Sequence, residues 1–379
     1  MLIASHQVIT GDRSQPRPLT LEVDGERVVA VHEGIRPGAE LLDGVVLPGY
    51  VDTHCHGGAG ADFTSPDPQA VRAAIGHHRR HGSTSIFAST VTADPAVVIQ
   101  QVALLRPLVA AGELAGIHLE GPFLAAERKG AHPAELLCDP APDTVDELLE
   151  AGEGTVRMVT LAPERDGGLA AVARLREAGV VPAFGHSDAD AATTEAAVEA
   201  GARVATHLFN AMRPVHHREP GPVPVLLTDQ RVVVELICDG VHLAPEVVRM
   251  AVAAAGPDRV ALVTDAMSAT GCADGRYQLG ALPVQVSGGT ARIVEADGRP
   301  GAIAGSTLTM DRAVEFLVAH GTSLVDASRM VSTTPARAHG LSEVGRLLPG
   351  SRADACLVDE AGRLLRVLHR GGWVTEGTT

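Results

Sequence analysis

The sequence predicts an α/β protein built on a (β/α)8 TIM-like barrel, with a small β-sandwich domain formed by the N- and C-terminal segments. From residue 45 onward, eight short β-rich runs alternate with Ala-rich helical patterns, as strand–helix units do. No Gly-rich dinucleotide fingerprint follows the first run, which disfavours the competing doubly wound open sheet. Short alternating runs with tight turns at both ends of the chain predict the separate β-domain.

The two ends of the chain share one pattern. Residues 1–46 hold short alternating runs, with Asp24-Gly25 as a hairpin signal, and residues 341–379 repeat this pattern. We therefore expect the two segments to pair into one β-domain beside a barrel of residues 47–340. The stretch 275–298 is expected to be a β insertion after the last barrel strand.

The barrel elements follow one another in order. The eight predicted strand runs are 45–56, 84–90, 115–121, 155–162, 180–187, 203–209, 232–240 and 259–267. Apolar residues at helical spacing between these runs predict helices, and the last three of the four clearest patterns each end at a glycine, as helices often do. Those four patterns occupy residues 67–82, 94–112, 168–179 and 189–201.

The composition of the chain argues against some classes of partner and cellular location. The 379 residues carry a net charge of -15, which argues against a nucleic-acid partner because such binding needs a basic surface. Five dispersed cysteines without a CxxC pair are typical of reduced thiols in the cytosol. No signal-peptide pattern and no apolar window of about 18 residues occurs, so we expect a cytoplasmic protein with no membrane partner.

His54 and His56 stand one residue apart at the end of the first apolar run. Alternate side chains of a strand point to the same face, so the two imidazoles are expected to project together while Cys55 faces away. Such a pair, followed at once by Gly57 and Gly58, suits a metal ion, although an isolated HxH also fits two ordinary polar residues at a strand end. The other strand ends decide between the two.

Six of the eight predicted strands carry a metal-competent or acid–base residue at or just past the C-terminal end, where barrels of this kind place their active site. Imidazole and carboxylate are the usual ligands of zinc and similar divalent ions, which lower the pKa of bound water towards about 7. A carboxylate beside such a site can carry the proton from water to a leaving group, so the set predicts a metal-dependent hydrolase. The residues are His54 and His56, Glu120, His186, His207, His242 and Asp265.

The motifs PGYVDTHCHG, GHSDA and TDAM resemble the amidohydrolase superfamily. Together, GIHLEGPF, KGAH, THLFNAM, REPG, DGVHL and AGSTLTM resemble one family within it, the N-acetylglucosamine-6-phosphate deacetylases. The resemblance runs from about residue 45 to residue 340, and the terminal β segments are similar too. It implies hydrolysis of the acetamido group of N-acetylglucosamine 6-phosphate by metal-activated water.

The resemblance also implies a metal centre. Glu120, His186 and His207 match the main metal ligands, and His54 with His56 match the second-metal pair of the superfamily, so one or two divalent ions are expected per subunit. Zinc is expected first, with iron, manganese or cobalt as alternatives. The sole lysine, Lys129, lies in the loop after Glu120 and not at the end of strand four. A carboxylated-lysine bridge from that strand is therefore excluded, and Glu120 is the better bridging candidate.

Further roles follow from the same resemblance. Asp265 matches the general acid/base, and Arg218 matches an arginine that reaches the phosphate from a neighbouring subunit, which implies a homodimer. An arginine fork suits a phosphate because it offers two charge-assisted hydrogen bonds. The other expected substrate contacts are Ala131, His132, Asn210, Ala211, His242, Ile303, Ala304 and Gly305.

Two alternatives stay open at this point. Another metal-dependent amidohydrolase, such as a cyclic amidase or an N-acyl amino-acid deacylase, should lack Arg218 and the FNAM phosphate loop. A non-catalytic assembly protein on the same scaffold should have lost ligands or the acid, and this chain retains them. The remaining histidines are expected to be solvated or structural, with His118 a candidate for a role behind the metal ligands.

Overall fold

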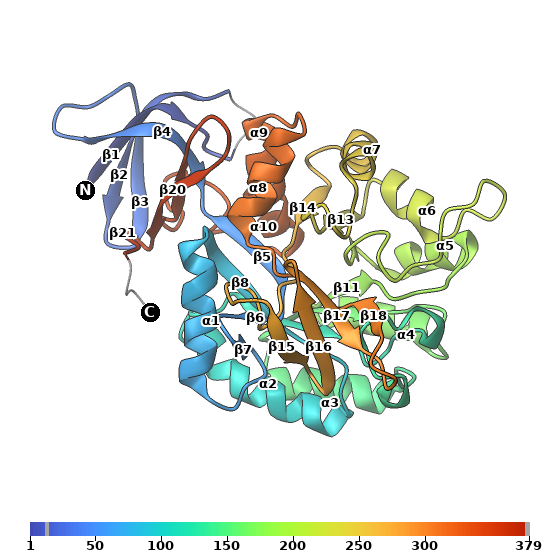
Figure 1. Cartoon of the computed structure of the whole chain (residues 1–379). Coiled ribbons are helices and arrows are strands. Elements are labelled where there is room, and N and C mark those ends of the chain that lie inside the picture. The colour runs from blue at the N-terminus through green and yellow to red at the C-terminus, as the bar shows by residue number, and fades with distance from the viewer. Residues whose placement is uncertain (12–14, 376–379) are drawn as a thin grey trace.

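The computed structural model describes residues 1–11 and 15–375 and shows the predicted barrel (Figure 1). Eight parallel strands form one sheet, in which each strand pairs with its neighbours in the chain order of the barrel. The sheet nearly closes on itself, because the Asp265 N–H donates to the His54 carbonyl at 2.8 Å. The barrel strands are β5 (Tyr50–Cys55), β8 (Ser83–Thr90), β9 (Gly116–Glu120), β10 (Val156–Leu161), β11 (Val181–Phe184), β12 (Val204–Ala205), β13 (Val233–Leu236) and β14 (Val260–Leu262).

Helices follow the strands and surround the barrel. Aspartate side chains cap three of them: Asp67, Asp94 and Asp190 each accept a backbone N–H of the first turn. The four helices predicted from apolar spacing are all present. The helices are α1 (Pro68–Arg80), α2 (Pro95–Ala110), α3 (Pro142–Gly152), α4 (Gly168–Glu177), α5 (Ala191–Ala200), α6 (Pro222–Thr228), α7 (Pro245–Ala255), α8 (Met310–Ala319), α9 (Leu324–Ser328) and α10 (Thr334–Ala338), with short 3₁₀ turns at Ala126–Arg128 and Ala134–Leu136 and a π turn at Arg329–Thr333.

Most predicted runs are longer than the strands they contain, and two of them differ from the structure in more than length. The run 45–56 is two strands: β4 (Glu40–Pro48) belongs to the terminal sheet and β5 to the barrel. They divide at Gly49, where a Cβ would lie 2.2 Å from the Thr84 hydroxyl. The run 203–209 contains only a two-residue strand, because the backbone leaves the sheet at His207 in a left-handed conformation.

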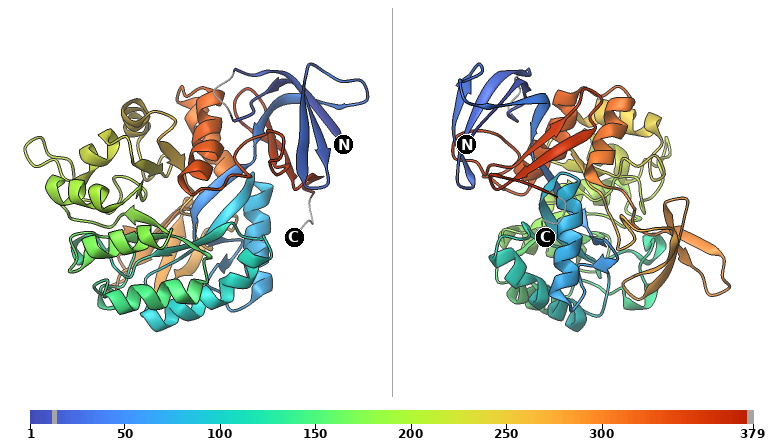
Figure 2. Two further views of the ribbon diagram at one scale, coloured as in Figure 1. Left: turned by 180° about the vertical axis from the view of Figure 1, so that it is seen from behind. Right: turned by 60° about the vertical axis from the view of Figure 1, so that its left-hand side comes forward.

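The two ends of the chain pair in one seven-stranded sheet, as predicted. The C-terminal β19 (Ala355–Val358) pairs antiparallel with the N-terminal β4, so blue and red strands lie side by side in both views of Figure 2. An isolated bridge between Arg27 and Arg352 also joins β3 to the segment before β19. The other strands of this sheet are β1 (Leu2–Val8), β2 (Arg17–Asp24), β3 (Arg27–Glu33), β19 (Ala355–Val358), β20 (Leu364–His369) and β21 (Gly372–Trp373).

The predicted β insertion is a four-stranded antiparallel sheet between β14 and α8. Its buried Val284, Val286 and Ile293 pack with Ala131 and Leu279 in one apolar cluster, so the insertion forms part of the wall around the barrel mouth. Its strands are β15 (Gly275–Leu279), β16 (Leu282–Ser287), β17 (Thr290–Val294) and β18 (Pro300–Ile303), and a short ribbon of β6 (Gly57–Gly58) and β7 (Ala61–Asp62) follows β5.

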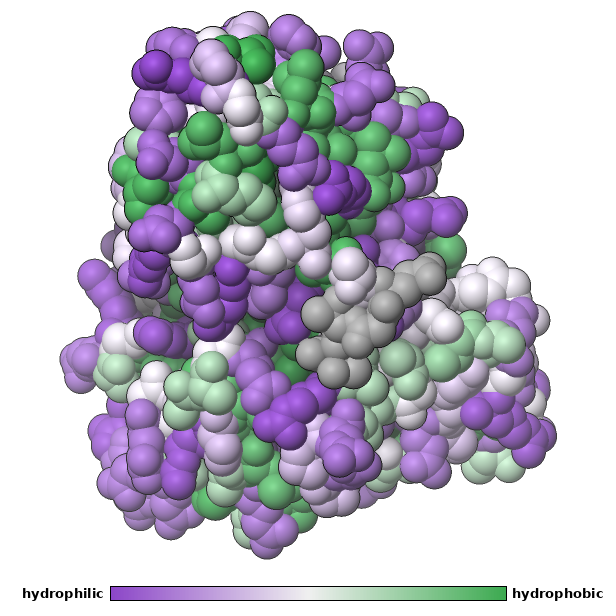
Figure 3. All heavy atoms as spheres, turned by 90° about the vertical axis from the view of Figure 1, so that its left-hand side faces the viewer, coloured by the Kyte–Doolittle hydropathy of each residue, from purple (hydrophilic) through white to green (hydrophobic). Residues whose placement is uncertain are grey.

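The surface mixes polar and apolar side chains. On the face seen in Figure 3, hydrophobic residues lie among hydrophilic ones and do not form one continuous hydrophobic patch. Within residues 1–11 and 15–375, no helix is both long and apolar enough to cross a membrane. All five cysteines are unpaired.

Candidate metal centre and active site

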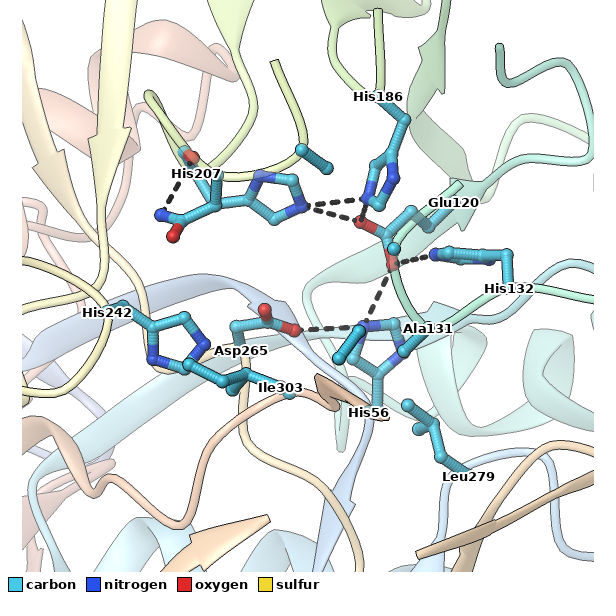
Figure 4. Close-up of a pocket in the computed structure, with 15 residues that line it drawn as sticks. His56, Glu120, Ala131, His132, His186, His207, His242, Asp265, Leu279 and Ile303 are labelled. Carbon is cyan, nitrogen blue, oxygen red and sulfur yellow. Dashed lines mark hydrogen bonds and ion pairs between the residues drawn. The ribbon is translucent and has the colours of Figure 1, made fainter. Parts of the chain in front are cut away.

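Polar side chains from six barrel strands meet at the C-terminal mouth of the barrel, around a cavity of about 220 Å³ (Figure 4). Glu120 is the last residue of β9, while the other polar groups lie within or just past the ends of their strands. The loop before α8 and the β insertion close the opposite side. The cavity is lined by His56, Glu120, Gly130, Ala131, His132, His186, His207, Asn210, Ala211, His242, Asp265, Leu279, Ala302, Ile303 and Gly305.

Two groups of metal-competent atoms share Glu120. One consists of His54, His56 and Glu120, the other of Glu120, His186 and His207, and within each group the donor atoms lie within 4.8 Å of one another. The Nε2 atoms of His54 and His56 are 3.1 Å apart, and those of His186 and His207 are 3.0 Å apart. Opposed imidazole nitrogens beside a carboxylate are the donor set that zinc and similar ions take, so these residues fit a divalent metal.

The orientation of His186 agrees with a ligand role. Its Nδ1 lies 2.9 Å from the Arg128 carbonyl oxygen, which only accepts hydrogen bonds. The proton of neutral His186 therefore sits on Nδ1, and the Nε2 lone pair faces Glu120 and His207. His118, on the same strand as Glu120, is not placed for ligation: its two ring nitrogens bond to the Ser89 and Thr160 hydroxyls at 2.9 and 2.8 Å.

Both carboxylates of the centre are ionised. Burial alone raises the pKa of Glu120, but His54 and hydrogen bonds from neighbouring imidazoles outweigh it, and the pKa falls well below its usual range. Burial likewise opposes ionisation of Asp265, while His54 and His56 lower its pKa to about 2. The Asp265 Oδ1 lies 3.2 Å from His56 Nε2 and faces the cavity. It is thus placed as a proton acceptor at neutral pH.

His132 and His242 stand on different sides of the cavity and are held differently (Figure 4). The backbone N–H of Thr92 donates to His132 Nδ1 at 3.4 Å, which leaves the Nε2 proton directed towards Glu120 Oε2 at 3.5 Å. Burial lowers the pKa of His132 to about 4, so this ring is neutral. Burial also disfavours charge on His242, but the Asp239 carboxylate, 2.7 Å from its Nδ1, prevails and raises its pKa.

The basic side chains near the mouth differ in their partners. Asp188 accepts from Arg128 Nε at 2.7 Å and from Arg213 Nη2 at 2.8 Å, so one carboxylate offsets part of their charge. Arg218 lies on an exposed loop, 2.7 Å from His217, and no carboxylate pairs with it among the described residues. Arg218 is therefore an arginine that this chain leaves open to an external anion.

The backbone is strained at the mouth. Five non-glycine residues there have positive φ: His186 (48°), His207 (30°), Phe209 (78°), Ala211 (51°) and Asp265 (49°). Left-handed conformations cost non-glycine residues on the order of 1–3 kcal/mol each and concentrate at functional sites. Here they turn three of the polar side chains inward just past the strands.

The structure brings most of the predicted site residues together, and three do not line the cavity. His54 lies beneath His56, with Nε2 3.4 Å from Asp265 Oδ1. Ala304 is buried in the apolar cluster of the β insertion, and Arg218 lies on its exposed loop. The orientation predicted for the HxH pair is confirmed, because Cys55 Sγ points away to His78 Nε2 at 3.3 Å.

Sequence reasoning missed several residues of the site. Leu279 and Ala302 line the cavity from the β insertion, and such apolar residues carry no chemical signal in a sequence. Asp239 holds His242, and Thr92 holds His132. The spacing of Asp239, three residues before His242 in a polar turn, was a usable signal, since Asp side chains bond to nearby backbone N–H groups in such turns.

Comparisons with known proteins agree with this geometry. The sequence model of the amidohydrolase family matches residues 45–374. The chain is 37% identical over 351 residues to an N-acetylgalactosamine-6-phosphate deacetylase of Escherichia coli O157:H7, covering 91% of this chain and 92% of that one. It is 34% identical over 338 residues to an N-acetylglucosamine-6-phosphate deacetylase of Bacillus subtilis (strain 168), covering 87% and 84%.

Solved structures extend the likeness to the whole fold. A mutant of N-acetyl-D-glucosamine-6-phosphate deacetylase from Mycobacterium smegmatis, in complex with N-acetyl-D-glucosamine-6-phosphate, superposes with a TM-score of 0.94 at 47% identity over 99% of both chains. The N-acetylglucosamine-6-phosphate deacetylase of Thermotoga maritima gives a TM-score of 0.89 at 30% identity, again over 99% of both.

Proposed function

The chain belongs to the amidohydrolase family, and on that premise we propose that it hydrolyses N-acetylglucosamine 6-phosphate to glucosamine 6-phosphate and acetate. The observation that carries this proposal is Asp265, an ionised carboxylate that shares one cavity with the Glu120 and histidine cluster. The relatives named above act on acetylated amino-sugar phosphates and cover most of the chain, which favours this activity over a cyclic amidase or an assembly role.

In the proposed reaction, a metal ion and the side chains of the protein have separate roles. His54, His56, Glu120, His186 and His207 would hold the divalent metal, which would supply a Lewis acid to polarise the amide carbonyl and to acidify water. Asp265 accepts a proton from the attacking water and then donates it to the departing amine nitrogen. His132, neutral and with its proton on Nε2, donates to the oxyanion that develops on the carbonyl.

The sugar and its phosphate are held farther from the metal cluster. His242, fixed by Asp239, offers its Nε2 to a sugar hydroxyl, while Ile303 and Gly305 line the cavity and Ala304 supports them from the apolar cluster behind. The backbone of Asn210 and Ala211 faces the phosphate. These contacts position the acetamido group against the cluster, which converts binding energy into orientation for attack.

We propose zinc as the working metal, since the donors are imidazoles and a carboxylate, with iron, manganese or cobalt as alternatives. The five unpaired cysteines suit a reducing cytoplasm. Residues 47–340 are proposed as the catalytic barrel, and residues 1–46 with 341–379 as a supporting β-domain.

A homodimer completes the proposal. Arg218 is exposed and free of carboxylate partners in the described chain, while Arg128 and Arg213 share Asp188, so Arg218 is the arginine best suited to reach the phosphate in a neighbouring subunit. Mixing Arg218→Ala with Asp265→Asn subunits tests this arrangement. A mixed dimer with shared sites has both lesions in one site and leaves the other intact, so activity should partly return. If mixed dimers form and no activity returns, Arg218 does not act across the interface.

The epimer of the sugar is a second candidate substrate, because the Escherichia coli O157:H7 relative is named for N-acetylgalactosamine 6-phosphate. The test is kcat/KM for acetate release from both sugar phosphates, from N-acetylglucosamine without phosphate and from an N-acetyl amino acid. We expect the glucosamine derivative to be preferred. A higher value for the galactosamine derivative assigns the enzyme to that epimer, and a higher value for the N-acetyl amino acid contradicts the proposal.

A further inference from the structure

Glu235 is a buried carboxylate that the proposed chemistry does not use. It lies on β13 inside the barrel and is 1% exposed. The Thr53 hydroxyl donates to its Oε1 at 3.1 Å, but its Oε2 has no hydrogen-bond partner among the described residues. The nearby His54 Nδ1 also lacks one, and the two atoms are 3.5 Å apart. Glu235 Oε2 and His54 Nδ1 are therefore close enough to become hydrogen-bond partners after a small shift.

Their proximity determines how His54 can act. An ionised carboxylate only accepts hydrogen bonds, so an imidazole facing it presents a protonated Nδ1. When His54 gives up its Nε2 proton, as a histidine must to bind a metal ion, that atom carries the lone pair. It lies 3.1 Å from His56 Nε2 and 3.5 Å from Glu120 Oε1. A buried carboxylate oxygen without a hydrogen-bond partner is costly, which favours the shortening of the contact between His54 Nδ1 and Glu235 Oε2 when His54 donates.

The four histidines of the cluster, His54, His56, His186 and His207, differ in the group that their Nδ1 atom faces. His186 has a backbone carbonyl at its Nδ1, whereas the Nδ1 atoms of His56 and His207 have no hydrogen-bond partner in the described chain. His54 alone among these four faces a carboxylate with its Nδ1. A carboxylate behind a ligating histidine fixes the ring and strengthens it as a ligand.

We propose that Glu235 is a positioning residue for the second metal position, the one formed by His54, His56 and Glu120: it holds the Nδ1–H of His54 and directs Nε2 to the ion. The inference rests on the metal centre of the proposed function. It predicts that Glu235 governs occupancy of this position and not of the position formed by Glu120, His186 and His207.

The test measures metal and not turnover. Wild type, Glu235→Leu and Glu235→Gln are dialysed against a series of Zn²⁺ buffers, and bound zinc per chain is determined together with circular dichroism of the same samples. Thr160→Val is the matched control, because Thr160 is equally buried in the barrel but contacts His118 and Thr206 instead of His54.

We expect Glu235→Leu to need about 10–100-fold more free Zn²⁺ to fill the second position, with the first unchanged. Glu235→Gln should shift less, since an amide oxygen still accepts, and Thr160→Val should match wild type. Wild-type affinities in Glu235→Leu, or equal weakening of both positions, overturn the inference. If Glu235→Leu does not fold, the imidazole ¹⁵N shifts of the wild-type zinc protein decide: an unprotonated His54 Nδ1 overturns it.

The inference and the proposed function fail separately. A wild type that never binds a second zinc overturns the inference while acetate release still supports the deacetylase. A wild type that binds two zinc ions in the expected pattern, yet releases no acetate, retains the inference and refutes the deacetylase.

Discussion

The barrel mouth and the terminal sheet are both built on β-strands, but they bury different kinds of side chain. The mouth encloses ionised carboxylates and imidazoles beside five residues with positive φ. The terminal sheet instead buries mainly apolar side chains, and the buried hydroxyls of Ser5 and Thr20 donate to the backbone carbonyls of Gly44 and Gly34. Its apolar cluster consists of Ile3, Val8, Leu19, Leu21, Val23, Val28, Leu42, Val46, Leu347, Ala353, Ala355, Leu357 and Leu368. The strained backbone and buried charges of the barrel mouth lower the stability of the fold in exchange for a reactive site, whereas the apolar burial in the terminal sheet raises it.

The largest effect that sharpens this contrast is expected at Asp265. Asp265→Asn keeps the shape of the side chain but removes its proton acceptor, so kcat should fall by about 10²-fold or more with fold and metal retained. The measurement is steady-state acetate release together with metal analysis. Asp297→Asn, on an exposed turn, is the control and should behave as wild type. Near-normal turnover in Asp265→Asn with metal bound removes Asp265 from the mechanism.

The opposite behaviour is expected in the terminal sheet. Leu19 on β2 is fully buried, so Leu19→Ala should lower the free energy of unfolding by about 2–5 kcal/mol through lost burial and a residual cavity. Its kcat and KM should stay at wild-type values at temperatures where the protein is folded. Denaturant unfolding and acetate release measure the two quantities. A large loss of kcat in the folded variant indicates that the sheet shapes the active site directly.

Arg218 is expected to have a smaller effect that separates binding from chemistry. Losing one charged hydrogen bond to the phosphate costs on the order of 2 kcal/mol, so Arg218→Ala should raise KM about 30-fold with little change in kcat. N-acetylglucosamine without phosphate should be a poor substrate for both proteins. Arg299→Ala, an exposed arginine of the β insertion, is the matched control. An unchanged KM in Arg218→Ala excludes this arginine from phosphate recognition.

The smallest effect is expected on the metal content, when one of the two metal positions is removed. Replacing both His54 and His56 with Ala should reduce bound metal from two towards one per chain, because Glu120, His186 and His207 remain as a complete donor group. Elemental analysis after equilibration with excess metal measures this directly. A wild type that never exceeds one metal per chain shows that the HxH pair is not a metal position.

Part of the site and of the fold could be predicted from the sequence alone. The ends of parallel strands meet at one rim, so the order of polar residues after the runs was enough to predict that His186, His207 and Asp265 converge. Hairpin signals likewise predicted the paired ends of the chain. The separation of β4 from β5 at Gly49 was missed, although Pro48-Gly49 lies inside the run from Val45 to His56 and is a dipeptide that commonly interrupts a strand.

The rest of the site depends on contacts between distant segments. Glu235 follows valines inside a predicted strand, and nothing near it in the sequence indicates that it lies behind His54. Leu279 looks like any buried residue of a hairpin until the β insertion packs over the mouth. Such relations across the barrel arise from tertiary packing and are invisible to local patterns.

The most direct test of the account measures acetate release from N-acetylglucosamine 6-phosphate as a function of metal bound per chain in the same samples. A chelator-stripped preparation is reloaded stepwise with Zn²⁺, and each sample is divided between elemental analysis and the acetate assay. The account predicts that acetate release is lost without metal and rises with zinc up to a plateau at one or two ions per chain. Full acetate release from the stripped protein, or none from the fully loaded one, contradicts it.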